Sequence, residues 1–400
     1  MNTDFGKHFL VLQNYCEQEN FKGYDPYDGL NSKIFQSIPF IRNNRFLRLA
    51  WIQFFKQCPV NFRPVVGIKK DYNPKGLGLF LSGYCNLYKA DPNPEYLEKI
   101  KFLTDKICAC QSQGYSGACW GYNFDWQARV FFQPKYSPTV VATSFIANAL
   151  LDAYELTGNE HLLEVAISSC NFVLSDLNRT PVKKGFVFSY SPVDKTSVYN
   201  ASLLGARLLA RCYSITKKPE YLEAAHLAIL GVCESQNENG SWYNAIESTQ
   251  QWIDNFHTAY NLECMNDYQL YTGDFQFNDY LQRGFDYYIN TFFTPKGEPK
   301  YYNNQLYPID IHCCSQLFIT LYKLNVIEKH QSLFQTVWNW TIANMQSSKG
   351  FFYYQKRRCY TNRVPYMRWT QAWMFYAMSL LNLYKKGINY DIKIKDISKG

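Results

Sequence analysis

The sequence predicts a single all-α domain in which six helical hairpins close into a ring. Two observations support this fold: helix patterns alternate with polar turns along most of the chain, and the turns recur at a nearly constant interval. Thr157-Gly158, Thr216-Lys217 and Thr272-Gly273 mark the same turn, 59 and then 56 residues apart. Because one hairpin cannot bury its apolar face alone, neighbouring hairpins must stack on one another.

Each hairpin pairs an inner helix, apolar on several faces, with an outer helix that carries charge on one face. The inner helices are expected to begin near residues 74, 138, 198, 257, 311 and 369. The outer helices are expected over 95–111, 160–177, 220–236, 277–293 and 331–346. Gly-and-aromatic segments at 185–190, 240–243 and 350–354 are expected to form short strands or extended loops between the hairpins.

Each of the first five inner helices is followed by an outer helix, but the sixth is not, so one position in the outer ring is left to fill. The helix expected over 44–57, within an N-terminal segment 1–70, is the candidate that fills this position and closes the outer ring. The same helix carries Arg45, Arg48 and Lys56 among Trp and Phe residues, so peripheral contact with an anionic membrane surface is the alternative. The chain is expected to be one domain over 1–400, with a basic tail at 386–400.

The composition indicates a folded protein with an anionic partner. Hydrophobic residues make up 47% of the chain and aromatic residues 18%, which is enough for a large core. The formal net charge of +8 favours an acidic ligand. Lys and Arg are dispersed, however, and no nucleic-acid motif accompanies them, so no nucleic acid is expected as a partner.

Neither a secretory signal nor an uncharged run of about 18 apolar residues is evident, so a cytoplasmic location is expected. The 13 Cys residues lack a disulfide framework, which fits reduced, buried thiols. The close pairs Cys108/Cys110 and Cys313/Cys314 lack the further ligands of a zinc site. We therefore expect neither a metal nor another cofactor, and the sequence does not indicate an oligomeric state.

One polar, aromatic loop pattern occurs twice, each time just before a helix. Trp252-Ile-Asp254-Asn-Phe-His257 leads into the fourth inner helix, and Tyr307-Pro-Ile-Asp310-Ile-His312 leads into the fifth. Both contain an Ile-Asp pair followed closely by a His. The chain has only six His residues, so two at matched positions indicate the rim of a site.

Three segments carry a family resemblance: Gly121-Tyr-Asn-Phe-Asp125-Trp-Gln-Ala-Arg129, the 252–257 loop, and Pro365-Tyr-Met-Arg368-Trp-Thr-Gln-Ala-Trp373. Together with the ring of hairpins, they resemble the six-hairpin, (α/α)6 toroid superfamily of carbohydrate-active proteins, and more closely the VpsJ-type proteins of bacterial polysaccharide-synthesis clusters. The resemblance covers nearly the whole chain from about Gly23. It implies a protein of polysaccharide metabolism in which the loops entering the inner helices line a central cavity.

Some of these relatives carry the label δ-aminolevulinic acid dehydratase. That enzyme is a (β/α)8 barrel, and this chain shows no alternating strand–helix pattern. An isoprenoid cyclase, which also has toroidal helices, is not favoured, because the chain contains no Asp-Asp-x-x-Asp or Asp-x-Asp-Asp run.

On the implied fold, the rim residues are the candidates for catalysis. Hydrolysis of a glycosidic bond needs two carboxylates, and Asp254 and Asp310 are the expected pair, with His257 and His312 as acid/base groups. An Asp just ahead of a helix is also a favoured N-cap, and a His there is also a common structural residue, so both interpretations remain open. The leading prediction is hydrolysis in an acidic or lipid-linked oligosaccharide.

Side chains around this pair are expected to bind the substrate, because aromatic rings stack on sugars and Arg pairs with a uronate carboxylate. The expected binding residues are Tyr122, Asp125, Trp126, Arg129, Asp194, Tyr199, Trp252, Arg368 and Trp369. Two alternatives to hydrolysis are a uronate lyase or C5-epimerase, and a glycan-binding scaffold without chemistry. The lyase or epimerase would use Tyr122, Tyr199 or Tyr260 with a His to abstract the proton next to the carboxylate.

Overall fold

The computed structural model describes residues 5–129 and 131–391. Six inner helices form a closed ring, in which each helix packs against the next and the last packs against the first. These helices are α5 (Pro74–Ala90), α7 (Val140–Thr157), α9 (Tyr199–Thr216), α11 (Asn255–Thr272), α13 (Ile311–Lys323) and α15 (Trp373–Lys385). A π-helical turn, η4 (Met367–Ala372), leads into α15. The ring confirms the predicted fold class.

Five outer helices follow inner helices along the chain, as the sequence predicts. They are α6 (Pro94–Ala109), α8 (Glu160–Asn171), α10 (Pro219–Cys233), α12 (Asn278–Phe292) and α14 (Gln331–Met345). In α12, for example, Leu281, Phe285, Tyr288 and Phe292 are buried while most of the other side chains are not. This one-sided burial is typical of a helix that covers a core.

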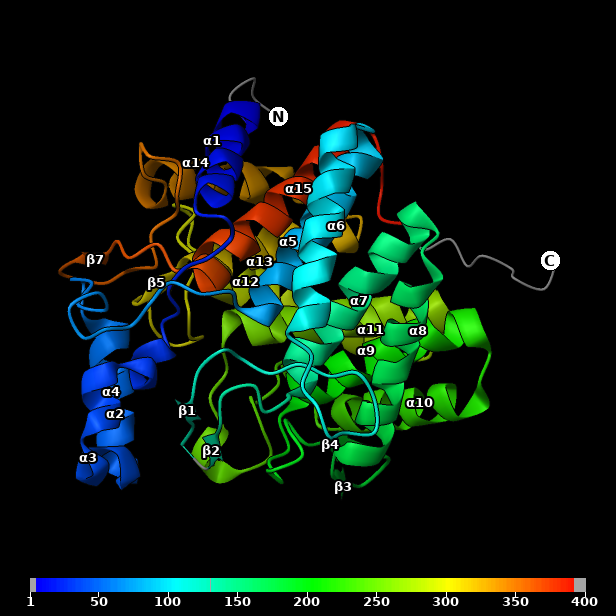
Figure 1. The fold of residues 1–400 in the computed structure, drawn as a ribbon. Helices are drawn as coiled ribbons and strands as arrows, with labels where there is room; N and C mark the ends of the chain where they lie inside the picture. The colour runs from blue at the N-terminus through cyan, green and yellow to red at the C-terminus, as the bar shows by residue number, and fades with distance from the viewer. Residues whose placement is uncertain (1–4, 130, 392–400) are drawn as a thin grey trace.

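The sixth outer position is filled by α1 (Phe5–Gln18), which packs against α15 (Figure 1). Phe5 and Phe9 of α1 contact Trp338 of α14 and Phe375 of α15, respectively. The expectation that the helix at 44–57 closes the outer ring is therefore wrong. The helix pattern there is real, but α1 buries its Phe residues on the ring, whereas the later helix buries only Ile52 and Phe55.

That later helix is α4 (Arg45–Gln57), and it belongs to an arm formed by residues 33–57. α2 (Lys33–Ser37) and α3 (Pro39–Asn43) complete the arm, which projects to one side of the ring at the lower left of Figure 1. A short helix, η1 (Asp28–Asn31), connects it to the preceding loop. None of the helices in residues 5–129 and 131–391 is long and apolar enough to cross a membrane.

Two buried ion pairs fix the loop before the arm. Asp25 accepts two hydrogen bonds from Arg368, at 2.6 and 2.8 Å. Asp28 accepts one from Arg63 at 2.6 Å, and Arg63 also donates to the hydroxyl of Tyr366. Because Arg368 lies in η4 and Tyr366 directly precedes it, these bonds hold the N-terminal loop against the start of the sixth inner helix.

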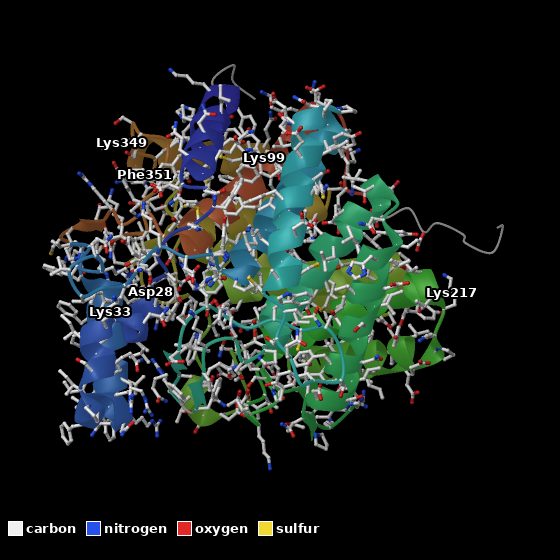
Figure 2. The ribbon with its side chains drawn as sticks, viewed as in Figure 1. Asp28, Lys33, Lys99, Lys217, Lys349 and Phe351 are labelled. Atoms are coloured by element: carbon white, nitrogen blue, oxygen red, sulfur yellow. The ribbon has the colours of Figure 1, made fainter. Side chains whose placement is uncertain are left out.

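The recurring turns of the sequence are the ends of inner helices. Gly158, Lys217 and Gly273 each follow an inner helix with left-handed backbone, at φ of 67°, 57° and 76°. This conformation lets the amide of the residue bond back to the last turn of its helix. Figure 2 shows Lys217 at the opposite edge of the view from Asp28, which lies near the helix starts.

Short antiparallel strands occur in the loops at the helix starts. β1 (Trp126–Gln127) pairs with β2 (Phe132–Gln133), and β3 (Arg179–Pro181) pairs with β4 (Phe186–Phe188). β5 (Ile309–Asp310), β6 (Gln355–Lys356) and β7 (Thr361–Asn362) form a three-stranded sheet. Of the three expected Gly-and-aromatic segments, 185–190 contains β4, whereas 240–243 and 350–354 form loops.

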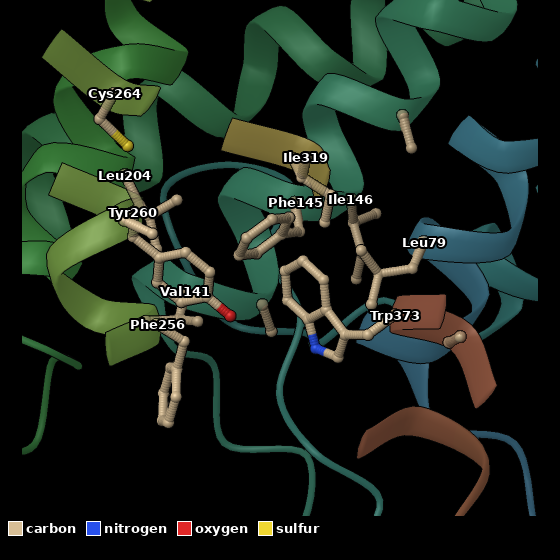
Figure 3. Packing of buried hydrophobic residues seen from close by; sticks show 14 of the residues in the cluster. Leu79, Val141, Phe145, Ile146, Leu204, Phe256, Tyr260, Cys264, Ile319 and Trp373 are labelled. Carbon is tan, nitrogen blue, oxygen red and sulfur yellow. The ribbon is translucent and has the colours of Figure 1, made fainter. Parts of the chain in front are cut away.

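Large apolar side chains fill the centre of the ring, and one apolar cluster extends from Phe5 to Leu383. Phe145, Tyr260 and Trp373 meet there from α7, α11 and α15 (Figure 3). The ring centroids of Phe145 and Trp373 lie 5.2 Å apart at 88°, and those of Tyr260 and Trp373 lie 5.5 Å apart at 25°. These three rings form a floor that closes the ring between its two ends.

The buried Asp25–Arg368 pair makes the first testable prediction. Asp25→Ala leaves an uncompensated guanidinium in the interior, so we expect the free energy of unfolding to fall by about 3–5 kcal/mol. Denaturant titration measures this change. Glu98→Ala, at an exposed position of α6, is the matched control and should shift stability by less than about 0.5 kcal/mol. Equal effects of the two substitutions would contradict the assigned role of the pair.

Candidate active site

A cavity of about 280 Å³ opens at the helix starts, and its lining includes Tyr260 of the aromatic floor and Lys75, which lies over all three rings of that floor. It draws side chains from the N-terminal loop, the arm, the β1–β2 hairpin and several inner helices. Its lining includes Tyr27, Lys56, Lys75, Tyr122, Trp126, Arg129, Tyr190, Asn200, Asn244, Trp252, Phe256, His257, Tyr260, Tyr301, Tyr302, His312, Arg368 and Trp369. The volume is close to the lower end of the range for small-molecule sites, about 300 Å³.

Asp254 holds His257 in place at this cavity. Asp254 is the N-cap of α11, where its Oδ1 accepts the backbone amide of His257 at 3.0 Å. Its Oδ2 accepts a hydrogen bond from Nδ1 of the His257 ring at 2.8 Å and another from Nε1 of Trp252 at 2.9 Å. Asp254 is 2% exposed and does not line the cavity, whereas the His257 ring does. The sequence candidate Asp254 is therefore placed behind the imidazole.

Because the carboxylate can only accept, Nδ1 of His257 carries the proton in this bond. The Nε2 atom, on the opposite edge of the ring, is left with a lone pair for the cavity. An imidazole held in one tautomer by a buried carboxylate is the standard arrangement of a general base.

His312 lies beside His257 but in a different environment. It is 1% exposed, and its ring stacks between Phe256 and Trp373, with ring centroids 4.5 and 4.4 Å away. Its Nε2 bonds the hydroxyl of Tyr260 at 2.8 Å, and its buried Nδ1 has no hydrogen-bond partner among the described residues. Burial, together with the nearby cations, lowers the pKa of His312 well below its usual value.

Asp310 repeats the capping role of Asp254 one hairpin further along. Its Oδ1 accepts the backbone amide of His312 at 2.9 Å, and its Oδ2 accepts Nε2 of Gln355 at 2.7 Å. Nε1 of Trp369 lies within hydrogen-bond distance of both oxygens. Asp310 is fully buried, does not line the cavity, and has its pKa raised to about 6 by burial. Its carboxylate fixes Trp369, which does line the cavity.

Within the described residues, every Lys, Arg, Asp or Glu side chain that lines the cavity is a basic one. Among the described residues, Lys56, Lys75, Arg129 and Arg368 line it, and no Asp or Glu does. Arg368 is neutralised by Asp25 behind it. The other three make no ion pair with a described carboxylate within 4.0 Å: Lys56 donates to the hydroxyl of Tyr27 at 2.9 Å, and Arg129 lies over the ring of Trp252. A cavity with this excess of positive charge favours an anionic ligand.

Aromatic rings form the remaining walls. Tyr122 and Tyr190 share a hydrogen bond between their hydroxyls at 3.1 Å, and the Trp126 ring packs against Tyr190. The guanidinium of Arg368 lies 5.0 Å from the centroid of the Tyr122 ring. Flat rings beside hydroxyl and guanidinium groups suit a sugar, which offers both apolar faces and hydroxyls.

Nine of the residues singled out in the sequence line this cavity. They are Tyr122, Trp126, Arg129, Trp252, His257, Tyr260, His312, Arg368 and Trp369. Five others, Asp125, Asp194, Tyr199, Asp254 and Asp310, do not. Asp125 accepts a hydrogen bond from the backbone amide of Lys135. Asp194 accepts hydrogen bonds from the hydroxyl of Ser191 and the backbone amide of Thr196, so both carboxylates stabilise their own loops. Tyr199 begins α9 and is 7% exposed.

Sequence reasoning missed Lys75, Lys56 and the tyrosines Tyr27, Tyr301 and Tyr302. Lys75 had a usable signal, because it is a lone charge at the start of the apolar stretch Gly76-Leu-Gly-Leu-Phe80. Lys56 and Tyr27 had none, since only the folding of the arm brings them to the cavity. Among the described residues, no three His, Cys, Asp or Glu side chains are grouped so that they could hold a metal ion.

Comparisons with known proteins support a carbohydrate-active fold. The family model of the β-L-arabinofuranosidase GH127 catalytic domain matches residues 62–229, which is less than half of the chain. No curated protein matches the sequence. The chain has an (α/α)6 toroid fold, as its closed ring of hairpins and its similarity to solved structures show.

Three of these structures illustrate the similarity. A sugar epimerase from a ruminal bacterium superposes with a TM-score of 0.62 at 12% identity, over 81% of this chain and 91% of that one. Cellobiose 2-epimerase from Bacillus thermoamylovorans gives 0.64 at 13% identity, over 78% and 88%. An unsaturated glucuronyl hydrolase specific for heparin gives 0.58 at 13% identity, over 82% and 91%. At these identities the likeness concerns the fold alone.

The low pKa of His312 makes the second prediction. In the unfolded chain this imidazole takes up a proton below a pH of about 6.5, whereas in the folded protein it stays neutral. The unfolded state then binds more protons, so this residue makes the protein less stable as the pH falls below about 6.5. We expect His312→Gln to reduce that acid sensitivity, measured as the difference between unfolding free energies at pH 7.5 and 5.5. An unchanged difference would contradict a neutral, buried His312.

Proposed function

We propose that the protein is a carbohydrate-active enzyme that removes and returns a proton at a sugar carbon next to a carbonyl or carboxylate group. The observation that carries the proposal is His257, held by Asp254 and facing a cavity that no described carboxylate lines. This is the chemistry of an epimerase or isomerase, and a lyase shares its first step, the removal of the proton. The alternative to hydrolysis that the sequence predicts is a uronate lyase or C5-epimerase.

Removal of such a proton needs a base close to the carbon and positive groups close to the oxygen that gains charge. His257 supplies the base through Nε2. The hydroxyl of Tyr260, bonded to the neutral His312, supplies a second site for proton transfer on the neighbouring helix. Arg368 and Lys75 supply positive or hydrogen-bonding groups at the same cavity.

The excess of cationic groups supports an acidic sugar as the substrate. Lys56 and Arg129 lack carboxylate partners and border the cavity from the arm and the β1–β2 hairpin. A uronate carboxylate bound between these two side chains would form an ion pair with each of them. A place in polysaccharide metabolism, which the VpsJ-type resemblance implies, is part of this proposal. The epimerases with the same fold support it further, although at 12–13% identity only as an analogy.

Hydrolysis of a glycosidic bond is the second candidate, and the match to the GH127 catalytic domain favours it. Asp254 and Asp310 would then be the two carboxylates. Their positions count against this role, because both are buried, both cap helices, and their oxygens are engaged by described donors. A glycan-binding scaffold is the interpretation without catalysis.

The third prediction tests proton transfer directly. The protein is incubated in D2O with reducing sugars and uronates, and deuterium in the sugar is measured by NMR. We expect incorporation at the carbon next to the carbonyl or carboxylate. His257→Gln should lower the rate by about 100- to 10,000-fold, because it removes the base, and Asp254→Asn should also lower it by releasing the ring.

The same variants separate the candidates. Asp310→Asn leaves His257 intact, so deuterium exchange should persist in a protein that remains folded. If reducing ends are released from oligosaccharides, no deuterium appears at carbon, and both Asn variants are inactive, hydrolysis replaces proton transfer as the function. If a sugar binds and neither reaction occurs, the scaffold interpretation holds.

We also propose that the arm contacts an anionic membrane surface, where a lipid-linked substrate would be held. Its outer side exposes Phe40, Phe46 and Phe54 at 75%, 76% and 51%, and Arg42 is exposed between them. Its inner side contributes Leu49, Gln53 and Lys56 to the cavity wall. Exposed rings beside basic side chains suit the boundary between lipid headgroups and acyl chains.

The fourth prediction concerns this surface. Sedimentation with vesicles that contain phosphatidylglycerol should recover the protein, and added salt should weaken the binding. The double variant Phe46→Ser/Phe54→Ser should lose most of it. Phe275→Ser, which removes a ring that is 57% exposed elsewhere on the molecule, is the control. Binding that survives in the double variant, or that is absent from the wild type, overturns the membrane contact.

A further inference from the structure

Lys75 is a basic side chain of the cavity that packs against its aromatic floor. It lies in the first turn of α5, is 4% exposed, and lines the cavity. Its Nζ lies 4.4 Å from the ring centroid of Phe145, 5.1 Å from that of Trp373 and 5.7 Å from that of Tyr260. Within the described part of the chain it forms no hydrogen bond and no ion pair.

A buried ammonium without a partner lowers the stability of the folded protein, because little replaces the hydration that it loses. Cation–π contacts with the three aromatic faces offset part of that free-energy cost. Two further cations act against it, Arg368 at the cavity and Arg207, whose guanidinium lies over the same Phe145 ring at 5.2 Å. Burial and these two cations lower the pKa of Lys75 well below its usual value.

Nothing in the packing requires an amine here. Capping of α5 is done by Asn73, which accepts the amide of Gly76, and the neighbours of Lys75 are rings that an apolar side chain would suit as well. An uncharged lysine amine is a nucleophile, and desolvated lysines next to other cations are the ones that form Schiff bases with carbonyl groups.

We propose that Lys75 is a covalent catalytic residue, whose Nζ forms an imine with the aldehyde carbon of an open-chain acidic aldose. The inference rests on the proposed function, because the imine would activate the same carbon from which His257 removes a proton. The carboxylate of the sugar would lie between Lys56 and Arg129 at the mouth, and its aldehyde would reach the amine on the floor.

The step balances as a condensation. The Nζ lone pair attacks the aldehyde carbon, and a proton moves from nitrogen to oxygen to give a carbinolamine. Loss of that hydroxyl as water leaves the C=N bond, which takes a proton to become an iminium. The iminium withdraws electrons from the adjacent carbon more strongly than the aldehyde does, so its C–H bond loses a proton to His257 more readily. Water returns the free sugar and the amine, and no oxidant or reductant is needed.

The test traps the imine by reduction. Wild-type protein is incubated at pH 7 with D-glucuronate and sodium cyanoborohydride, and the adduct is located by peptide mass mapping. We expect a gain equal to the sugar less one oxygen atom on the peptide that contains Lys75, well above the level at the exposed Lys217. Galactose, which lacks the carboxylate, should label Lys75 less than glucuronate does.

Three variants make the result decisive. Lys75→Arg keeps a cation but cannot form an imine, so it should lose both the adduct and the deuterium exchange. Lys75→Met removes the buried amine and should be at least as stable as the wild type, which shows that any loss of activity is not loss of fold. His257→Gln should lose the exchange but keep the adduct.

An adduct at Lys75 that is no stronger than at Lys217 overturns the proposal. Full deuterium exchange by Lys75→Arg also overturns it, because the side chain would then act only as a positive charge for the sugar carboxylate. In both cases proton transfer by His257 still stands. An adduct at Lys75 without any deuterium exchange has the opposite meaning: the imine is supported and the proposed function fails.

Discussion

The Asp254 carboxylate accepts hydrogen bonds from the amide of His257, the imidazole of His257 and the indole of Trp252, and the arrangement of the candidate site depends on it. One group caps α11, selects the tautomer of the base and orients an aromatic wall of the cavity. The capping bond fixes the helix start, so the imidazole bond starts from a rigid backbone. The His257 ring, the proposed base, is therefore positioned by the same carboxylate that begins the helix.

The ring places a second copy of this arrangement beside the first. α11 and α13 are neighbours, so Asp254 and Asp310 cap adjacent helices, and His257 and His312 border the same cavity. The copies have diverged. Asp310 binds an indole and an amide side chain instead of an imidazole, and the imidazole that follows it bonds Tyr260. The repeated helix start thus carries the proposed base in one hairpin and a buried, neutral ring in the next.

Much of this could be predicted from the sequence, because helix periodicity and regular turns report on local structure. The six inner helices and the paired rim loops are of this kind. The role of Asp254 and Asp310 could not be decided, since a cap and a catalytic carboxylate have the same sequence pattern and differ only in whether the oxygens face the cavity. α1 was missed as the closing helix because its choice over α4 depends on contacts with α14 and α15. Lys56 entered the site for the same kind of reason, through the folding of the arm.

The floor of Phe145, Tyr260 and Trp373 has a consequence for the shape of the substrate. Both Lys75, which lines the candidate site, and Arg207 lie over the Phe145 ring, and Arg207 borders a separate hollow at the opposite end of the ring of helices. The barrel is therefore blind rather than a tunnel. A polysaccharide therefore cannot be threaded through the ring, and any ligand that enters this cavity leaves through the same mouth.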